Sequence, residues 1–268
     1  VYYKIKADYT NFLSSMGIEA REFIPVSAKL GINIAKTSGE IPWYKGPSVL
    51  SMLDKFTEKQ PPTHLPFRFP VQDVYKFDDR RIISGRVESG TVNVGDQIVF
   101  SPSNKMGVIG SIEAWSVENQ PIEAKASQSI GFTLKEQVFV ERGDVATLKS
   151  ELPIVSTTFD VNIFWMGKRH LEKGITYKLK LTTQEVPCEI VEFKKVVDAS
   201  TLETHKGQEF LAKNDVAEVT LRTFTPVVFD LFGSIPTTGR FVLVDEYDVC
   251  GGGIITTYTP NKTDRLRD

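Results

Sequence analysis

The chain has 268 residues, of which 41% are hydrophobic and 25% charged, as in a soluble globular protein of one to three domains. Its 32 Lys and Arg residues against 34 Asp and Glu residues give a formal net charge of -2, which excludes a global field that recruits nucleic acid or an anionic membrane. The apolar runs are far shorter than the roughly 20 residues of a membrane helix, and no secretory signal opens the chain. We therefore expect a cytoplasmic protein.

The first predicted element is a helix from Tyr3 to Met16, because Ile5, Tyr9, Phe12 and Met16 recur at helical spacing. Apolar residues at 49, 50, 52, 53 and 56 predict a second, short helix. Residues 60–66 hold three prolines, which cannot continue a helix and favour an extended linker. Residues 1–59 are therefore expected to form an α/β unit.

Between these helices, the apolar run 23–26 leads into Ser27, Ala28 and Lys29. A buried strand that ends in such a tripeptide is typical of the guanine-binding end of a nucleotide-binding domain. In many other α/β proteins a serine at this place simply caps the following turn. The tripeptide alone favours the capping interpretation, and only the sequence that follows it favours the guanine-binding one.

From residue 67 the pattern changes to short strand-like segments separated by turn signals. The strands expected in a first block, 67–151, are 67–75, 81–88, 97–100, 107–115, 129–134 and 145–148. Those expected in a second block, 152–258, are 157–165, 175–181, 186–197, 216–224, 241–245 and 250–258. Strands this short and closely spaced predict a mainly β protein with two consecutive antiparallel β-barrels, followed by a charged tail, 259–268.

Few residues of this chain suggest chemistry. Gly251, Gly252 and Gly253 invite a phosphate-binding reading, but no helix N-terminus follows them, so close backbone approach or a β-bulge is the better hypothesis. Cys188 and Cys250 have no metal-ligand spacing and are expected to be core thiols. The three histidines, His64, His170 and His205, are expected at the surface. We assign no catalytic residue and no metal site.

Several segments resemble translation-factor GTPases of the elongation factor 1-alpha branch. The first block resembles that family's first barrel at 69–76, at 84–90 and at the turn 141–145. Within the branch, three segments resemble the large GTP-binding subunit of bacterial sulfate adenylyltransferase: 41–47 (IPWYKGP), 161–166 (VNIFWM) and 174–180 (GITYKLK). Residues 239–245 (GRFVLVD) also resemble a strand of elongation and release factors.

The resemblance implies that residues 1–59 are the C-terminal part of a P-loop GTPase domain, with Ser27, Ala28 and Lys29 as peripheral guanine contacts. It implies GTP and magnesium as cofactors of the intact protein. The chain contains no Gly-x-x-x-x-Gly-Lys-Ser/Thr. Its Asp-x-x-Gly runs, 230–233 and 248–251, and its Asn-Lys-x-Asp run, 261–264, fall in the second β block and the tail rather than ahead of Ser27, so we expect this piece to bind no nucleotide and to be inactive by itself.

The sulfate branch implies a regulatory GTPase that drives ATP and sulfate to adenosine 5'-phosphosulfate as part of a heteromer with a catalytic ATP-sulfurylase subunit. The alternative is an elongation- or release-factor-like GTPase that carries tRNA or a translation partner, and a third hypothesis is a bare β-barrel interaction module. A tRNA carrier needs a basic stripe. The only dense basic pairs are Arg80-Arg81, Lys168-Arg169 and Lys194-Lys195, so we expect neither a nucleic-acid nor a membrane partner.

Overall fold

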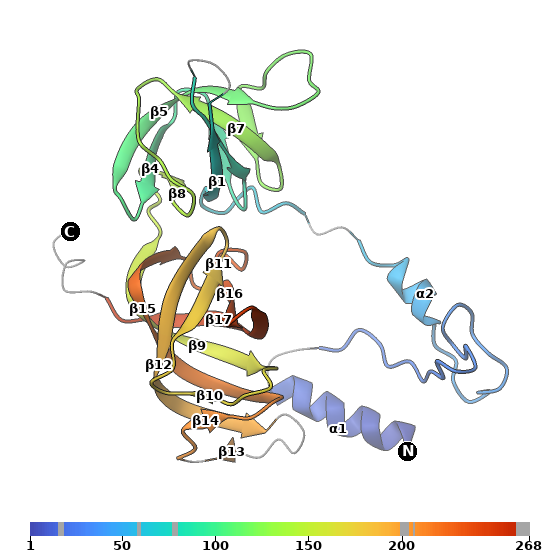
Figure 1. Ribbon diagram of the computed structural model, residues 1–268. Coiled ribbons are helices and arrows are strands. Elements are labelled where there is room, and N and C mark those ends of the chain that lie inside the picture. Colours follow the sequence, from blue (N-terminus) through green and yellow to red (C-terminus); the bar gives the residue numbers. More distant parts are fainter. Residues whose placement is uncertain (16–18, 58–59, 77–79, 199–203, 206, 261–268) are drawn as a thin grey trace. The chain divides into compact units, whose positions relative to one another are not determined.

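The structure, a computed structural model, describes residues 1–15, 19–57, 60–76, 80–198, 204–205 and 207–260. The chain divides into two compact units, Val1–Gln60 and Pro61–Asp268. Figure 1 shows the first unit with its helices and the second with its strands. In the described residues, no helix is long and apolar enough to cross a membrane.

The first unit contains two helices, α1 (Tyr2–Ser15) and α2 (Val49–Leu53). Both were predicted; Met16, the expected end of the first, lies outside the described residues. The Ser48 side chain caps α2 by accepting a hydrogen bond from the Ser51 amide at 3.3 Å. The helix ends at Leu53, earlier than its apolar pattern indicates.

The apolar run 23–26 differs from the expected strand. It makes no strand pairing in the described part of the chain, and only Ser27 beside it forms an isolated bridge, to Ile32. The two backbone hydrogen bonds of that bridge are 3.3 and 3.1 Å long. A β-strand is defined by its hydrogen-bonded neighbour, and the sequence alone does not show whether that neighbour is present.

The first barrel of the second unit is closed by six antiparallel strands in the order β1-β2-β7-β5-β4-β8. A two-stranded sheet of β3 and β6 lies outside this ring of strands. Aromatic residues such as Phe69, Phe100 and Phe132 are fully buried inside the barrel. The strands are β1 (Phe69–Tyr75), β2 (Ile82–Arg86), β3 (Thr91–Asn93), β4 (Gln97–Ser101), β5 (Lys105–Glu113), β6 (Glu123–Lys125), β7 (Ser129–Leu134) and β8 (Val145–Leu148).

The second barrel runs in the order β11-β16-β17-β9-β15-β12 and is closed by pairing of β11 with β12. Its main strands are β9 (Ile154–Trp165), β11 (Tyr177–Leu181), β12 (Gln184–Asp198), β15 (Asp215–Phe229), β16 (Arg240–Asp245) and β17 (Asp248–Tyr258). Three short strands were not predicted: β10 (Leu171–Glu172) pairs with β14 (Phe210–Leu211), and β13 (Thr204–His205) extends the sheet beyond β12. The prediction of two antiparallel barrels is confirmed.

The three glycines of β17 allow close packing between strands. A Cβ atom on Gly253 would lie 2.6 Å from the Asn162 carbonyl oxygen and 2.6 Å from the Phe241 ring. The register of β17 also shifts between Leu243 and Val244 of β16 and again between Ile255 and Thr257. Close backbone approach in a barrel strand is therefore confirmed as the role of this run.

A buried ion pair joins the segment before β1 to the second barrel. The Arg68 guanidinium donates to both carboxylate oxygens of Asp230, at 2.8 and 2.9 Å, and to the carbonyl oxygen of Glu151 at 2.7 Å. The Thr238 hydroxyl donates to the same carboxylate at 2.7 Å. Because both charges have several partners, their burial is compensated.

Candidate functional site

The three residues expected to contact guanine lie in one turn of the first unit. Ser27 is half-buried at the isolated bridge, and Ala28 and Lys29 are exposed in the turn that Ile32 closes. Buried Asn33 holds this turn: its side-chain amide donates to the Pro25 carbonyl at 2.9 Å. Sequence reasoning missed Asn33, although asparagine is a frequent residue at positive φ, here 55°.

The cysteines are core thiols, as expected. Both lie in the hydrophobic core of the second barrel, and burial raises the pKa of the Cys188 thiol to about 12. A thiol with such a pKa stays protonated at neutral pH and is a poor nucleophile. Among the described residues, no group of His, Cys, Asp and Glu is arranged to hold a metal ion.

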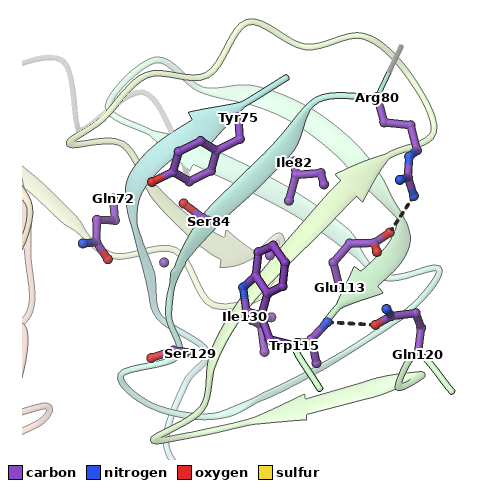
Figure 2. Close-up of a pocket in the computed structure, with 13 residues that line it drawn as sticks. Gln72, Tyr75, Arg80, Ile82, Ser84, Glu113, Trp115, Gln120, Ser129 and Ile130 are labelled. Atoms are coloured by element: carbon purple, nitrogen blue, oxygen red, sulfur yellow. Dashed lines mark hydrogen bonds and ion pairs between the residues drawn. The ribbon is translucent and has the colours of Figure 1, made fainter. Parts of the chain in front are cut away.

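A hollow of about 850 Å³ lies on the first barrel. Residues from β1, β2, β5 and β7 and from the loop after β5 line it (Figure 2). Two aromatic side chains form its walls: Tyr75 at the end of β1 is 44% exposed, and Trp115 after β5 is 83% exposed. Large exposed aromatic side chains beside a cavity are typical of binding sites.

The floor of the hollow is a cross-strand row of small and polar residues. Ser84 on β2 pairs with Gly131 on β7, which pairs with Glu113 on β5. A Cβ atom on Gly131 would lie 2.5 Å from Ile82 Cγ2, so the space between these strands requires glycine. The Ile82 side chain therefore packs over Gly131 and forms part of the floor.

Glu113 places a carboxylate on this floor. Its Oε1 atom accepts a hydrogen bond from the Ser111 hydroxyl at 2.7 Å and a longer one from Arg80 Nη1 at 3.4 Å, which Figure 2 marks. The Glu113 side chain is only 19% exposed, whereas that of Arg80 is 55% exposed. The site therefore combines a carboxylate held in one orientation, a long basic side chain and two aromatic rings.

The loop between β5 and β6 continues the apolar surface beside the hollow. The Gln120 side chain closes this loop by accepting a hydrogen bond from the Ala114 amide at 2.8 Å. Ser116 adopts positive φ, 59°, directly after Trp115. The loop leaves Val117 exposed and Ile122 78% exposed. This concentration of exposed apolar side chains at one place indicates an interaction surface.

Sequence reasoning missed this hollow. It included Trp115 in an expected strand, 107–115, whereas β5 ends at Glu113 and Trp115 belongs to the loop. The row of Ser84, Gly131 and Glu113 comes from three strands, and only their register brings the residues together. An aromatic residue next to the turn-forming run 116–121 was the one available signal.

The chain is similar to translation-factor-type GTPases. Residues 158–256, most of the second barrel, match the family described as GTP-eEF1A C-terminal domain-like. A solved structure of sup35 complexed with GDP has the same fold, with a TM-score of 0.69 at 23% identity over 96% of this chain and 65% of that chain.

The relatives that the chain matches carry two names. Elongation factor 1-alpha of Aeropyrum pernix is 33% identical over 94% of this chain and 59% of that protein. Sulfate adenylyltransferase subunit 1 of Shewanella oneidensis is 30% identical over 92% of this chain and 51% of that protein, and that of Laribacter hongkongensis is 31% identical over 97% and 54%. The chain thus spans little more than half the length of these relatives.

Proposed function

We propose that the intact protein is the GTP-binding regulatory subunit of a sulfate adenylyltransferase. The partner subunit catalyses adenylyl transfer from ATP to sulfate, which yields adenosine 5'-phosphosulfate and pyrophosphate, and GTP hydrolysis drives this uphill reaction. The two barrels contribute to the contact with that partner. Changes of nucleotide state alter the docking of the GTPase domain on them.

The observation that carries this proposal is the charge pattern of the second barrel. Basic side chains there are paired with acidic ones: Lys194 with Asp160 at 2.6 Å, Arg169 with Asp245 at 2.7 Å, and Lys173 with Glu209 at 2.7 Å. Further pairs are Lys180 with Glu185 and Arg222 with Glu189. Neutralised cations contribute little to the phosphate contacts that dominate nucleic-acid affinity, so this pattern favours a protein partner.

Exposed aromatic and sulfur side chains in the sulfate-branch segments support the proposal. Trp43 in the segment 41–47 and both Phe164 and Met166 in the segment 161–166 are exposed. Trp165 between them is buried, and its indole nitrogen donates to the Arg169 carbonyl at 2.8 Å. Exposed aromatic and methionine side chains are frequent anchors of protein interfaces.

In the intact protein, Ser27, Ala28 and Lys29 supply peripheral contacts to guanine, and GTP is bound with magnesium. We assign residues 1–59 to the C-terminal part of the GTPase domain, 60–66 to a linker, 67–151 and 152–258 to the two barrels, and 259–268 to a tail. This piece alone is inactive, because it contains no Gly-x-x-x-x-Gly-Lys-Ser/Thr loop to bind the phosphates.

The alternative is an elongation- or release-factor-like GTPase that carries tRNA or a translation partner. The relatives named elongation factor 1-alpha, at 32% to 33% identity, favour it as much as those named sulfate adenylyltransferase subunit 1 favour the first proposal. The charge pattern decides our preference between the two.

Affinity purification of the intact tagged protein from its own cells tests the proposal. We expect an ATP-sulfurylase subunit to copurify at a fixed stoichiometry that persists in moderate salt. Copurification of aminoacyl-tRNA that salt removes, with no sulfurylase subunit, would instead establish the alternative, because counterion release makes nucleic-acid binding steeply dependent on salt.

A further inference from the structure

We propose that the hollow between Tyr75 and Trp115 is a docking site for an arginine side chain of a protein partner. The hollow offers a guanidinium what it needs: aromatic faces at the sides, a carboxylate on the floor and apolar surface for the methylene stem. The identity of the partner as the catalytic sulfurylase subunit rests on the proposed function. The preference of the hollow for arginine does not rest on it.

The walls favour a cation. Tyr75 and Trp115 come from different elements, β1 and the loop after β5, and Figure 2 draws both rings over the strands that line the hollow. The faces of such rings attract cations, tryptophan most strongly, and arginine stacks on them more often than lysine does. Tryptophan, tyrosine and arginine are also the residue types that contribute most to protein interfaces.

The Glu113 carboxylate on the floor favours a positively charged group of the partner. The two hydrogen bonds described for the Glu113 carboxylate both fall on Oε1, which leaves Oε2 as the atom that an incoming donor reaches. Ser111 fixes the orientation of this carboxylate at 2.7 Å. Arg80 competes only weakly, since its contact is 3.4 Å long and its side chain is 55% exposed, and exposed pairs of this kind contribute about 0–1 kcal/mol.

The carboxylate on the floor favours a guanidinium over an ammonium. A guanidinium presents several donors in one plane, which match the two oxygens of a carboxylate. Ile82 beside the row gives apolar surface to the stem.

The loop between β5 and β6 enlarges the site beyond the hollow, to an area that a protein partner can cover. Val117 and Ile122 are exposed in the same loop as Trp115. A free amino acid or a small metabolite covers only the hollow, whereas a polypeptide that inserts an arginine also covers this loop. Interfaces commonly surround such an anchor with apolar contacts that exclude water.

The first test uses the full 268-residue chain labelled with nitrogen-15. N-acetyl-arginine amide should shift the Trp115 indole signal and the Gly131 amide signal. N-acetyl-citrulline amide, which keeps the planar shape without the charge, should bind roughly tenfold more weakly. Glu113→Gln should reduce arginine binding by a similar factor, and Glu118→Gln, an exposed acid of the same loop, should leave it unchanged.

Equal binding of the arginine and citrulline probes, or an unchanged affinity in Glu113→Gln, would overturn the proposal. So would tighter binding of adenosine monophosphate at the same signals without dependence on Glu113, because this result assigns the hollow to a nucleobase. The signals of Glu113→Gln from residues outside the hollow should be identical to those of the unchanged chain. This control excludes misfolding as the cause of lost binding.

The second test uses the intact protein with its copurifying partner. Trp115→Ala and Glu113→Gln should each weaken association of the two subunits by roughly tenfold or more, with Glu118→Gln as the control. Full association in both variants would contradict the docking site. Arginine binding in the hollow without any sulfurylase partner would contradict the proposed function and leave the hollow's specificity standing.

Discussion

At the scale of single residues, Arg68 and Asp230 form a deeply buried ion pair, with side chains that are 4% and 10% exposed. Removal of one member leaves the other buried and without its charge partner, so Arg68→Ala should lower the free energy of unfolding by about 3–5 kcal/mol. Urea unfolding monitored by circular dichroism measures this loss. Arg222→Ala, which breaks the more exposed pair with Glu189, is the control and should cost less than about 1 kcal/mol.

A double variant separates charge from packing at the same place. Arg68→Met combined with Asp230→Leu should recover most of the stability lost in Arg68→Ala, because apolar replacement of a whole buried pair is often neutral. If the double variant is as unstable as the single one, the hydrogen bonds from Arg68 to the Phe67 and Glu151 carbonyl oxygens are what stabilise this junction.

The pair of Asp160 and Lys194 predicts a pH dependence. Burial raises the pKa of Asp160, but hydrogen bonds from Lys194 and Thr220 outweigh it and hold the pKa below its usual value. A carboxyl group whose pKa is lowered by folding stabilises the fold at pH values above its pKa in the unfolded chain, about 3.9. This contribution disappears as the pH falls through the lower pKa of the folded state. Lys194→Met should therefore lose about 0.5–1 kcal/mol at pH 7 and progressively less below about pH 4.

Unfolding curves for Lys194→Met between neutral and acid pH test this sign. The matched control is Lys195→Met, which removes the neighbouring exposed lysine and should change stability little at any of these pH values. A loss in Lys194→Met that grows as the pH falls would contradict the pairing with Asp160.

At the scale of elements, β17 provides a matched pair of glycines. Gly253→Ala places a methyl group 2.6 Å from the Asn162 carbonyl oxygen and from the Phe241 ring, and such overpacking costs typically about 1–3 kcal/mol. Gly252→Ala meets only the Phe241 carbonyl oxygen at 3.8 Å and should be tolerated. Thermal unfolding of the two variants compares them directly, and equal destabilisation would contradict the close approach of β17 to β9.

Most strands of the barrels could be predicted, because alternation and turn residues are local signals. The expected 129–134 and 145–148 match β7 and β8. The short strands β3, β6, β10, β13 and β14 were missed, since two or three residues carry no detectable period. The apolar run 23–26 shows the opposite error: its composition favours a strand, but strand formation depends on a partner that composition does not reveal.

The candidate site could be predicted much less well than the fold. Trp165 lies in the core, because it belongs to a strand of alternating burial that was predicted at 157–165. Trp115 has equal hydrophobicity and is exposed, because β5 ends two residues before it. The floor of Ser84, Gly131 and Glu113 depends on the register of three strands, which no local pattern encodes.

At the scale of the whole molecule, the account predicts that this chain does not bind GTP with useful affinity. The contacts proposed for Ser27, Ala28 and Lys29 are to the base alone, and the sequence contains no Gly-x-x-x-x-Gly-Lys-Ser/Thr loop to bind the phosphates. Isothermal titration with GTP and GDP should show no binding in the micromolar range, which corresponds to about 8 kcal/mol. Micromolar binding would contradict the assignment of residues 1–59 to one end of the GTPase domain.

The central claim is that the intact protein couples GTP turnover to sulfate activation. The most direct measurement is the rate of adenosine 5'-phosphosulfate formation by the intact protein reconstituted with its sulfurylase subunit, with and without GTP. We predict that GTP accelerates the reaction, that a non-hydrolysable GTP analogue does not sustain it, and that the sulfurylase subunit alone shows no response to GTP. A rate independent of GTP in the reconstituted heteromer would contradict the account.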